Sequence, residues 1–319
     1  MKNQKIILLK HKIEPEKNGC IITRRIFLKI SILTAAGLYS GLSPVKANFS
    51  NSQTNRRFGI VTDTHYADIP NGKKTFNSES LAKMNECVET MNNEKVNFLI
   101  ELGDLKDISH PVSESITLEY LDAIEKVFTK FNGPRYHVLG NHDMDCISKE
   151  KFLSHIENTG IPKRKKYYSF ERIGLHFIVL DANYTSDGLD YECGNFEWSD
   201  TNIPQSEIDW IKKDLLSSEK PVIVFTHQLL DGSFGPATIN NAKKVRRVLE
   251  NSGKVLAVFQ GHLHKGRYRK INKIHYYTLR AMVLGKGKEN NSYAIVEIYN
   301  DHINITGYRK AVDKKCIIR

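Results

Sequence analysis

No apolar run in this sequence is long enough to cross a membrane. The candidate stretch, residues 30–42, has 13 residues, whereas a membrane-spanning helix needs about 20. Internal repeats, heptads and low-complexity tracts are also missing, which excludes solenoids and coiled coils. With 319 residues, 40% of them hydrophobic, the chain can bury a sizeable core as one large domain or two small ones.

Cysteine is scarce as well, with five residues in the chain. Cys20 has no apolar run before it, so it does not match a lipoprotein acceptor. The other four show no C-x-x-C spacing, and four cysteines allow three different pairings; they are Cys87, Cys146, Cys193 and Cys316. No disulfide is therefore predicted.

The excess of basic over acidic residues is concentrated at the N-terminus. The formal net charge is +11, but residues 1–47 contain nine Lys/Arg and two Asp/Glu, which leaves only +4 for the remainder. A mildly basic body does not indicate binding driven by charge. We therefore expect no stable complex with nucleic acid.

The N-terminal segment has the organisation of an export signal. Its residues 23–29, Thr-Arg-Arg-Ile-Phe-Leu-Lys, resemble a twin-arginine signal, and the apolar residues 30–42 and a small-x-small site at residues 45–47 follow. We predict that residues 1–47 are a signal peptide recognised by the twin-arginine export machinery. Its removal would leave no membrane anchor and place the protein outside the bacterial cytoplasm, in the periplasm or extracellular space. The alternative is an amphipathic N-terminal helix with an accidental arginine pair.

Predicted strands and helices alternate after a polar linker at residues 48–57. Short runs rich in β-branched and aromatic residues predict strands at residues 58–62, 96–102, 135–139, 175–180, 221–226 and 255–260. Helical periodicity predicts helices at residues 78–92, 115–131, 148–158, 204–216 and 240–251. This alternation predicts an α/β fold with a largely parallel core.

The pattern changes after His264 to four short predicted strands, at residues 266–271, 273–280, 292–299 and 302–308. We expect these strands to form an antiparallel meander that completes a second sheet. The domain is predicted to span residues 58–312, and residues 313–319 are assigned to a C-terminal tail.

Five polar clusters follow predicted strands directly. They are Asp63-Thr64-His65, Gly103-Asp104, Gly140-Asn141-His142-Asp143, His227 and Gly261-His262-Leu263-His264. In α/β sheets, ligands bind beyond the carboxyl ends of the strands. We therefore expect the five clusters to meet at one edge.

In order and residue type these clusters match the pattern D-x-H, G-D-x-x-[DE], G-N-H-[DE], a lone His and G-H-x-H. On this basis the chain from Phe58 onward resembles a calcineurin-like metallophosphoesterase. The resemblance implies a two-sheet β-sandwich flanked by helices, a four-layer αββα arrangement. It also implies two divalent metal ions, one bound by Asp63, His65 and His264, the other by Asn141, His227 and His262, with Asp104 bridging both.

The resemblance also implies a di-metal hydrolase in which a metal-bridging hydroxide cleaves phosphoester bonds. With the predicted signal peptide, this would be an exported hydrolase. His142 would act as general acid or transition-state stabiliser, and Asp107 or Asp143 would orient His142 or a ligand. The mixed nitrogen and oxygen ligands favour Mn, Fe, Zn or Co over Mg or Ca, without deciding among the four.

The expected substrate is a phosphorylated small molecule or a nucleotide. The residues from Phe58 to Asp63, with Tyr66-Ala67-Asp68 beyond them, also resemble the subgroup that acts on ADP-ribose and CDP-alcohols, although that subgroup often has Gln where His65 stands. General phosphatase and phosphodiesterase activities stay open. A non-catalytic binding scaffold on the same fold is the remaining alternative, and it would be expected to lack ligands that this chain retains.

Other polar and aromatic residues have simpler interpretations. His137 and His176 lie within predicted strands and are expected in the core or at the surface, and Asp181 is expected to cap a turn. The longest irregular segment, residues 183–202, contains four aromatic residues. These could stack on a base or pack as the small core of their own loop; they are Tyr184, Tyr191, Phe196 and Trp198.

Overall fold

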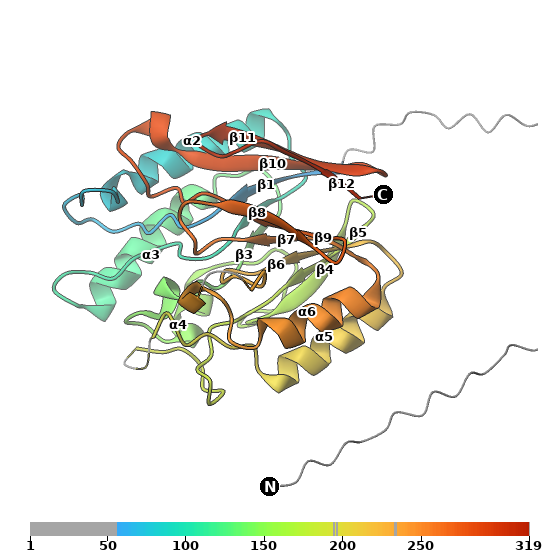
Figure 1. Ribbon diagram of the computed structural model, residues 1–319. Helices are drawn as coiled ribbons and strands as arrows, with labels where there is room; N and C mark the ends of the chain where they lie inside the picture. The colour runs from blue at the N-terminus through green and yellow to red at the C-terminus, as the bar shows by residue number, and fades with distance from the viewer. Residues whose placement is uncertain (1–55, 194, 196, 233–234, 319) are drawn as a thin grey trace, which may run out of the picture. The chain divides into compact units, whose positions relative to one another are not determined.

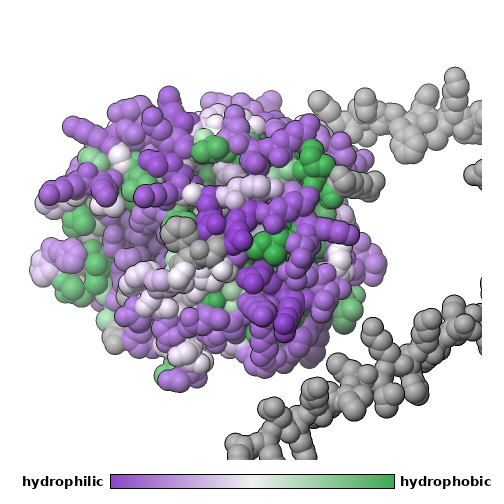
Figure 2. Space-filling view, viewed as in Figure 1, coloured by the Kyte–Doolittle hydropathy of each residue, from purple (hydrophilic) through white to green (hydrophobic). Residues whose placement is uncertain are grey.

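The computed structural model describes residues 56–193, 195, 197–232 and 235–318. The predicted signal peptide at residues 1–47, residues 48–55 of the predicted linker, and Phe196 lie outside this part of the chain. Within it, no helix has the length and apolar character needed to span a bilayer. The face drawn in Figure 2 is mostly hydrophilic, and its apolar residues form small, separate patches.

The described domain contains two six-stranded sheets (Figure 1). The first has the strand order β12-β11-β10-β1-β2-β3. Its strands are β1 (Arg57–Val61), β2 (Leu99–Glu101), β3 (Arg135–His137), β10 (Ser292–Ile298), β11 (His302–Arg309) and β12 (Lys314–Ile317). Strands β1, β2 and β3 are parallel, whereas β10, β11 and β12 join them as an antiparallel extension.

The second sheet has the strand order β4-β5-β6-β7-β9-β8. Its strands are β4 (Tyr168–Arg172), β5 (Leu175–Val179), β6 (Val222–Phe225), β7 (Val255–Gln260), β8 (Arg267–Ile271) and β9 (Ile274–Thr278). The four inner strands are parallel, and the edge strands β4 and β8 are antiparallel to their neighbours. Both sheets thus have parallel strands at the positions from which the polar clusters emerge.

Helices cover the outer face of each sheet. They are α2 (Ser80–Asn93), α3 (Glu114–Phe128), α4 (Lys149–His155), α5 (Gln205–Ser217) and α6 (Ala242–Ser252), with 3-10 turns η1 (Asn77–Glu79), η2 (His142–Met144), η3 (Gly235–Ala237) and η4 (Lys288–Asn290). The sequence sets several of the ends. The side chains of Ser113 and Ser148 accept N-capping hydrogen bonds at α3 and α4, and Gly253 ends α6 with φ 65°.

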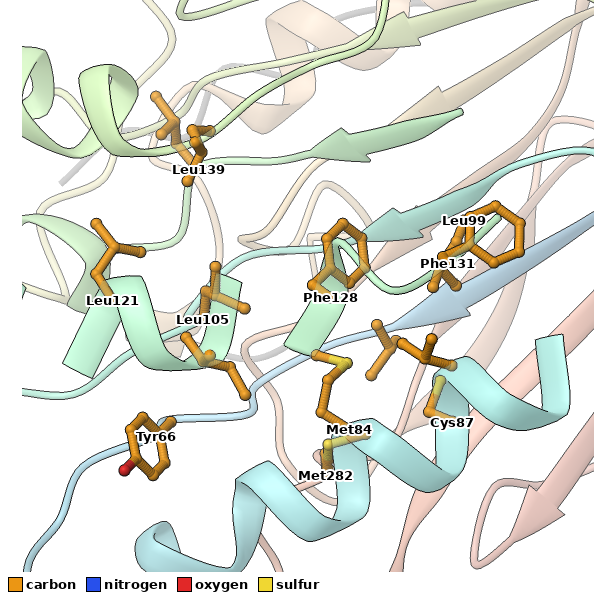
Figure 3. Close-up of a cluster of buried hydrophobic side chains, with 14 of the residues drawn as sticks. Tyr66, Met84, Cys87, Leu99, Leu105, Leu121, Phe128, Phe131, Leu139 and Met282 are labelled. Carbon is orange, nitrogen blue, oxygen red and sulfur yellow. The ribbon is translucent and has the colours of Figure 1, made fainter. Parts of the chain in front are cut away.

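Three hydrophobic layers hold these elements together, because strand residues alternate between the two faces of each sheet. Residues of α2 and α3 pack against one face of the first sheet, as Met84, Leu121 and Leu99 show in Figure 3. Residues of α5 and α6 pack in the same way on the second sheet. The layer between the sheets is rich in aromatic rings; Phe58, for example, stacks on Phe98 at 4.9 Å. The predicted four-layer αββα fold is thereby confirmed.

The C-terminal strands differ from the prediction. The four strands predicted after His264 were expected to form one meander, but β8 and β9 belong to the second sheet, and β10 and β11 belong to the first together with β12. Residues 279–291 cross between the sheets, where Met282 N–H donates to Thr62 O at 3.1 Å. Residues 313–319 were assigned to a tail, yet Lys314–Ile317 forms β12, because Cys316 turns its side chain into the inter-sheet core. Strand β4 was also not predicted.

Two adjacent leucines on α5 test the layer between this helix and the second sheet. Leu215 is 3% exposed and Leu216 is 79% exposed. We expect Leu215→Ala to lower the free energy of unfolding by about 2–5 kcal/mol, because it leaves a cavity in the core. Leu216→Ala should change it by less than about 0.5 kcal/mol. Urea unfolding at a fixed metal concentration measures both, and equal effects would contradict the assigned packing.

Candidate metal centre

The seven predicted metal ligands lie together at one end of the sandwich. Four follow β1, β2 and β3 of the first sheet, namely Asp63, His65, Asp104 and Asn141. Three follow β6 and β7 of the second sheet, namely His227, His262 and His264. Parallel strands end at the same edge of a sheet, and the stacking of the two sheets brings both edges together. The site is therefore built between the sheets.

A first group consists of Asp63, His65 and His264, whose ligand atoms lie within 4.8 Å of one another. The Nε2 atoms of His65 and His264 are 3.1 Å apart. Asp63 Oδ1 lies 3.8 Å from the His65 nitrogen and 3.4 Å from the His264 nitrogen. Two ring nitrogens approach this closely when a proton or a cation lies between their lone pairs.

A second group consists of Asp104, His227 and His262, again with ligand atoms within 4.8 Å of one another. The Nδ1 atom of His227 is 2.8 Å from Leu102 O, which directs Nε2 toward Asp104 Oδ2 at 3.1 Å. A backbone carbonyl bound to one ring nitrogen orients the other for metal binding. Asn141 is buried and lines the same cavity.

The carboxylate of Asp104 lies between the two groups. Its Oδ2 is 3.4 Å from His65 Nε2 of the first group and 3.1 Å from His227 Nε2 of the second. Its Oδ1 accepts a hydrogen bond from the backbone N–H of His142 at 2.7 Å. This is the position from which one carboxylate can contact two cations.

Buried ligand-type atoms without hydrogen bonds mark the same place. Among the described residues, Oδ1 of Asn141 and Nε2 of His262 are buried and have no hydrogen-bond partner. Leaving such an atom unsatisfied costs about 1–3 kcal/mol. Carboxylate, imidazole and amide groups together suit divalent transition metals. The residues present thus fit two divalent cations.

The electrostatics of the cluster favour positive charge. Burial alone would raise the pKa of Asp104, but the charges of His227 and His65 hold that pKa below its usual range. Burial lowers the pKa of His65, but the charge of Asp104 and the contacts with Asp107 and Asp63 together raise that pKa well above its usual value. Burial and the neighbouring His227 lower the pKa of His262 to about 3. Buried carboxylates therefore draw positive charge to a place where one imidazole stays neutral, which suits metal binding.

Four of the predicted ligands have a left-handed backbone. The φ angles are 51° at Asp63, 43° at His65, 60° at Asp104 and 64° at His262. This conformation is uncommon outside glycine and costs about 1–3 kcal/mol per residue. The loops are also closely packed, since a Cβ on Gly140 would lie 2.0 Å from the backbone nitrogen of Asp104. Strain of this kind is concentrated at functional sites.

The predicted catalytic residue, His142, lies between two carboxylates at the cavity. Its Nδ1 is 3.5 Å from Asp107 Oδ1 and 3.5 Å from Asp145 Oδ2. Asp107 Oδ2 is also 3.5 Å from Nδ1 of His65. The structure thus places Asp107 where it can orient both rings. The side chain of His142 is 35% exposed.

Asp143, the other carboxylate considered for orienting the site, contacts backbone instead of His142. Its oxygens accept hydrogen bonds from the N–H groups of Gly140, Asp104 and Leu105 at 2.8, 3.1 and 2.9 Å. Burial and the charge of Asp104 raise the pKa of Asp143 to about 6. Asp143 therefore acts on the site by fixing the loop that carries Asp104.

Sequence reasoning missed two residues beside His142. The ammonium of Lys106 is buried and contacts both the Asp145 carboxylate and the backbone oxygen of His142. Lysine is rarely buried without a partner, and Lys106 occupies an unspecified position of G-D-x-x-[DE]. Asp145 lies two residues beyond the G-N-H-[DE] cluster. Closeness to the clusters was the only available signal for either residue.

The residues that the sequence analysis kept out of the site have other partners. His137 and His176 are buried, and their Nε2 atoms lie 2.9 Å and 2.6 Å from carboxylates. Asp181 Oδ1 accepts a hydrogen bond from Asn183 N–H at 3.0 Å, which is the turn cap that was predicted.

A cavity of about 430 Å³ opens onto the cluster. Its polar floor is formed by Asp104, Asn141, His142, His262 and His264. Its remaining lining is apolar and consists of Trp198, Pro236, Ala237 and Leu263. A ligand in this cavity would therefore meet both metal-binding types of side chain and apolar side chains.

The four-layer fold and the paired ligand groups define a metal-dependent phosphoester hydrolase that uses two divalent metal ions. The sequence model of the calcineurin-like phosphoesterases matches residues 56–266. The chain belongs to this family.

Similar proteins agree with this assignment. The chain is 26% identical over 302 residues to a manganese-dependent ADP-ribose/CDP-alcohol diphosphatase of Oryza sativa subsp. japonica, covering 80% of this chain and 92% of that protein. A protein of the same name from Arabidopsis thaliana is 24% identical and is covered to 93%. The crystal structure of a dimetal phosphatase from Danio rerio superposes with a TM-score of 0.71 at 18% identity, covering 82% of this chain and 99% of that one.

The three hydrogen bonds to Asp143 generate a prediction. We expect Asp143→Asn to lower the free energy of unfolding by about 1–3 kcal/mol, because an amide cannot accept from all three buried N–H groups. Urea unfolding in EDTA removes the contribution of bound metal. Asp187→Asn is the matched control, since Asp187 is exposed. Equal stability of the two variants would show that Asp143 does not brace the loop.

Proposed function

We propose that this protein hydrolyses the diphosphate linkage of nucleoside diphosphate derivatives of the ADP-ribose or CDP-alcohol type. The observation that carries the proposal is the complete cluster of seven ligand-type side chains, of which Asp104, Asn141, His262 and His264 line one cavity. The match to two diphosphatases over more than nine tenths of their length supports the substrate class. A scaffold without activity would not be expected to keep all of these groups.

In this proposal Asp63, His65 and His264 bind one cation, and Asn141, His227 and His262 the other. Asp104 contacts both. When bound, the two cations lower the pKa of a water molecule and neutralise charge on the phosphoryl oxygens. Manganese is the proposed metal because both plant relatives are named as manganese-dependent; Fe, Zn and Co suit the same ligands.

His142 supplies the proton or hydrogen bond that the leaving oxygen requires. Its side chain is partly exposed and lines the cavity, while its backbone N–H is fixed by Asp104 Oδ1. Asp107 and Asp145 face its Nδ1, so these carboxylates orient the ring from that side. The two carboxylates position the imidazole, and the ring itself performs the transfer.

Turnover of ADP-ribose with Mn²⁺ tests the reaction. Hydrolysis should release AMP and ribose 5-phosphate and should stop on addition of EDTA. Asp104→Ala is expected to reduce kcat/KM by at least about 1,000-fold, because it removes the carboxylate shared by both cations. Asp187→Ala, at an exposed site, serves as control.

Unchanged turnover in Asp104→Ala would reject the metal centre. Turnover of bis(4-nitrophenyl) phosphate without any turnover of ADP-ribose or CDP-alcohols would keep the phosphoester hydrolase and reject the proposed substrate class. Turnover of these substrates is then compared with Mn²⁺, Fe²⁺, Zn²⁺ and Co²⁺ as the added metal. The comparison gives both the preferred substrate and the preferred metal.

We also propose that the folded, metal-loaded protein is exported through the twin-arginine pathway. The support is the sequence of residues 23–47. A fusion of residues 1–57 to a reporter should appear outside the cytoplasm, and replacing Arg24 and Arg25 together by lysine should retain it inside, although the net charge is unchanged. Export of the double-lysine fusion at the normal level would contradict the proposal.

A further inference from the structure

A large, partly exposed aromatic side chain lines the metal-site cavity. Trp198 is 45% exposed, and among the large exposed hydrophobic residues of the described chain it alone lines this cavity. Its ring lies 6.1 Å from that of His262, at an interplanar angle of 47°. A tilted contact of this kind covers only part of the indole, so apolar ring surface faces the cavity and water.

The turn that carries Trp198 is fixed by hydrogen bonds. Asp200 N–H donates to Glu197 O at 2.9 Å. The hydroxyl of Tyr191, a residue that is completely buried, contacts the carbonyl oxygens of both Glu197 and Asp200. Asn240 donates to the Asp200 carboxylate at 2.9 Å. These bonds fix the backbone of the turn, and the turn places the indole of Trp198 at the cavity.

A buried ion-pair network anchors the same loop to the metal centre. The ammonium of Lys149 is 2.7 Å from carboxylate oxygens of both Asp181 and Asp190, and Asp190 directly precedes Tyr191. Asn183 donates to Leu139 O at 2.8 Å and accepts from Gln228 at 2.6 Å. Leu139 leads into Gly140-Asn141, and Gln228 follows His227. The position of the loop is thus tied to two of the proposed ligand segments.

We infer that Trp198 stacks on the base of the nucleotide substrate, while the phosphates of the substrate bind at the polar floor of the cavity. This inference rests on the proposed function and extends it, because it assigns the residue that distinguishes a nucleotide from other phosphate esters. The cavity is lined by four apolar residues beside the proposed metal ligands and His142, namely Trp198, Pro236, Ala237 and Leu263. A sugar phosphate needs only the floor, whereas a planar base has a π-face that an indole can cover.

The two products of ADP-ribose hydrolysis provide a matched pair of probes. AMP and ribose 5-phosphate both carry a phosphate monoester on a ribose, and only AMP carries a base. The chain contains two tryptophans, of which Trp210 lies on α5 with its ring 4.9 Å from that of Tyr167. In a Trp210→Phe variant, therefore, all tryptophan emission comes from Trp198.

The first experiment titrates Mn²⁺-loaded Trp210→Phe protein with each probe, using excitation outside the absorption of adenine. AMP should change the emission of Trp198 in a saturable manner, and ribose 5-phosphate should leave it largely unchanged. Unchanged emission at saturating AMP would overturn the inference. This readout does not depend on turnover.

The second experiment compares inhibition of hydrolysis by the two probes in wild type, Trp198→Leu and Trp198→Phe. Leucine keeps an apolar side chain and removes the aromatic ring. In Trp198→Leu, the inhibition constant of AMP and the KM for ADP-ribose should both rise roughly 10-fold or more. The inhibition constant of ribose 5-phosphate should change little. Phenylalanine should recover most of the loss. The partial exposure of Trp198 means that thermal stability should be nearly unaffected.

The outcomes separate this inference from the proposed function. Equal weakening of both probes, or an equal loss of kcat on every substrate, would show that Trp198 instead positions His262. If the wild type fails to hydrolyse ADP-ribose while AMP still changes the emission of Trp198, base stacking stands and the proposed substrate is wrong.

Discussion

The placement of one buried carboxylate, that of Asp104, controls the geometry of the whole site. The loop after β2 in the first sheet carries it, yet its Oδ2 faces His227 from the second sheet at 3.1 Å. Its two oxygens make different contacts, because Oδ1 accepts a hydrogen bond from the backbone N–H of His142. That single contact also fixes the segment bearing Asn141 and His142. The distance between the two ligand groups therefore depends on how firmly the backbone of Asp104 is held, and Asp143 holds it.

The site combines a strained backbone at the ligand positions with many hydrogen bonds from the residues around them. Left-handed residues at four ligand positions oppose folding by about 1–3 kcal/mol each, and burial of several charges adds to that cost. The three apolar layers stabilise the rest of the domain enough to tolerate it. Local bonds define the conformation, for example from the Thr64 hydroxyl to Leu105 O and from Asn77 to His65 O. The hydrogen bonds therefore hold the proposed ligands in a preorganised geometry.

Much of this architecture could be predicted from the sequence, because strand ends and metal-binding residues coincide. All six strands predicted before His264 exist, and they bring the five clusters together. Features that depend on tertiary contacts were missed. Strand β12 is half polar and gains its place by pairing with β11. Lys106 and Lys149 are buried, although lysine is usually exposed, because each pairs with a buried carboxylate. These partners lie far away in sequence or outside any motif, so the burial could not be predicted. The division of the C-terminal strands between two sheets was likewise invisible to periodicity.

The segment between β9 and β10 has a mechanical consequence. It is bonded to both sheets beside the ligands: Ala281 N–H donates to His264 O at 3.0 Å, and Val283 N–H donates to Asp63 O at 3.1 Å. Lys83 on α2 holds it from outside through Met282 O at 3.0 Å. Sliding one sheet over the other at this end would break the hydrogen bonds of this segment to at least one of the two sheets. The segment thus acts as a brace that resists a change in the separation of Asp63 and His264, which lie on different sheets.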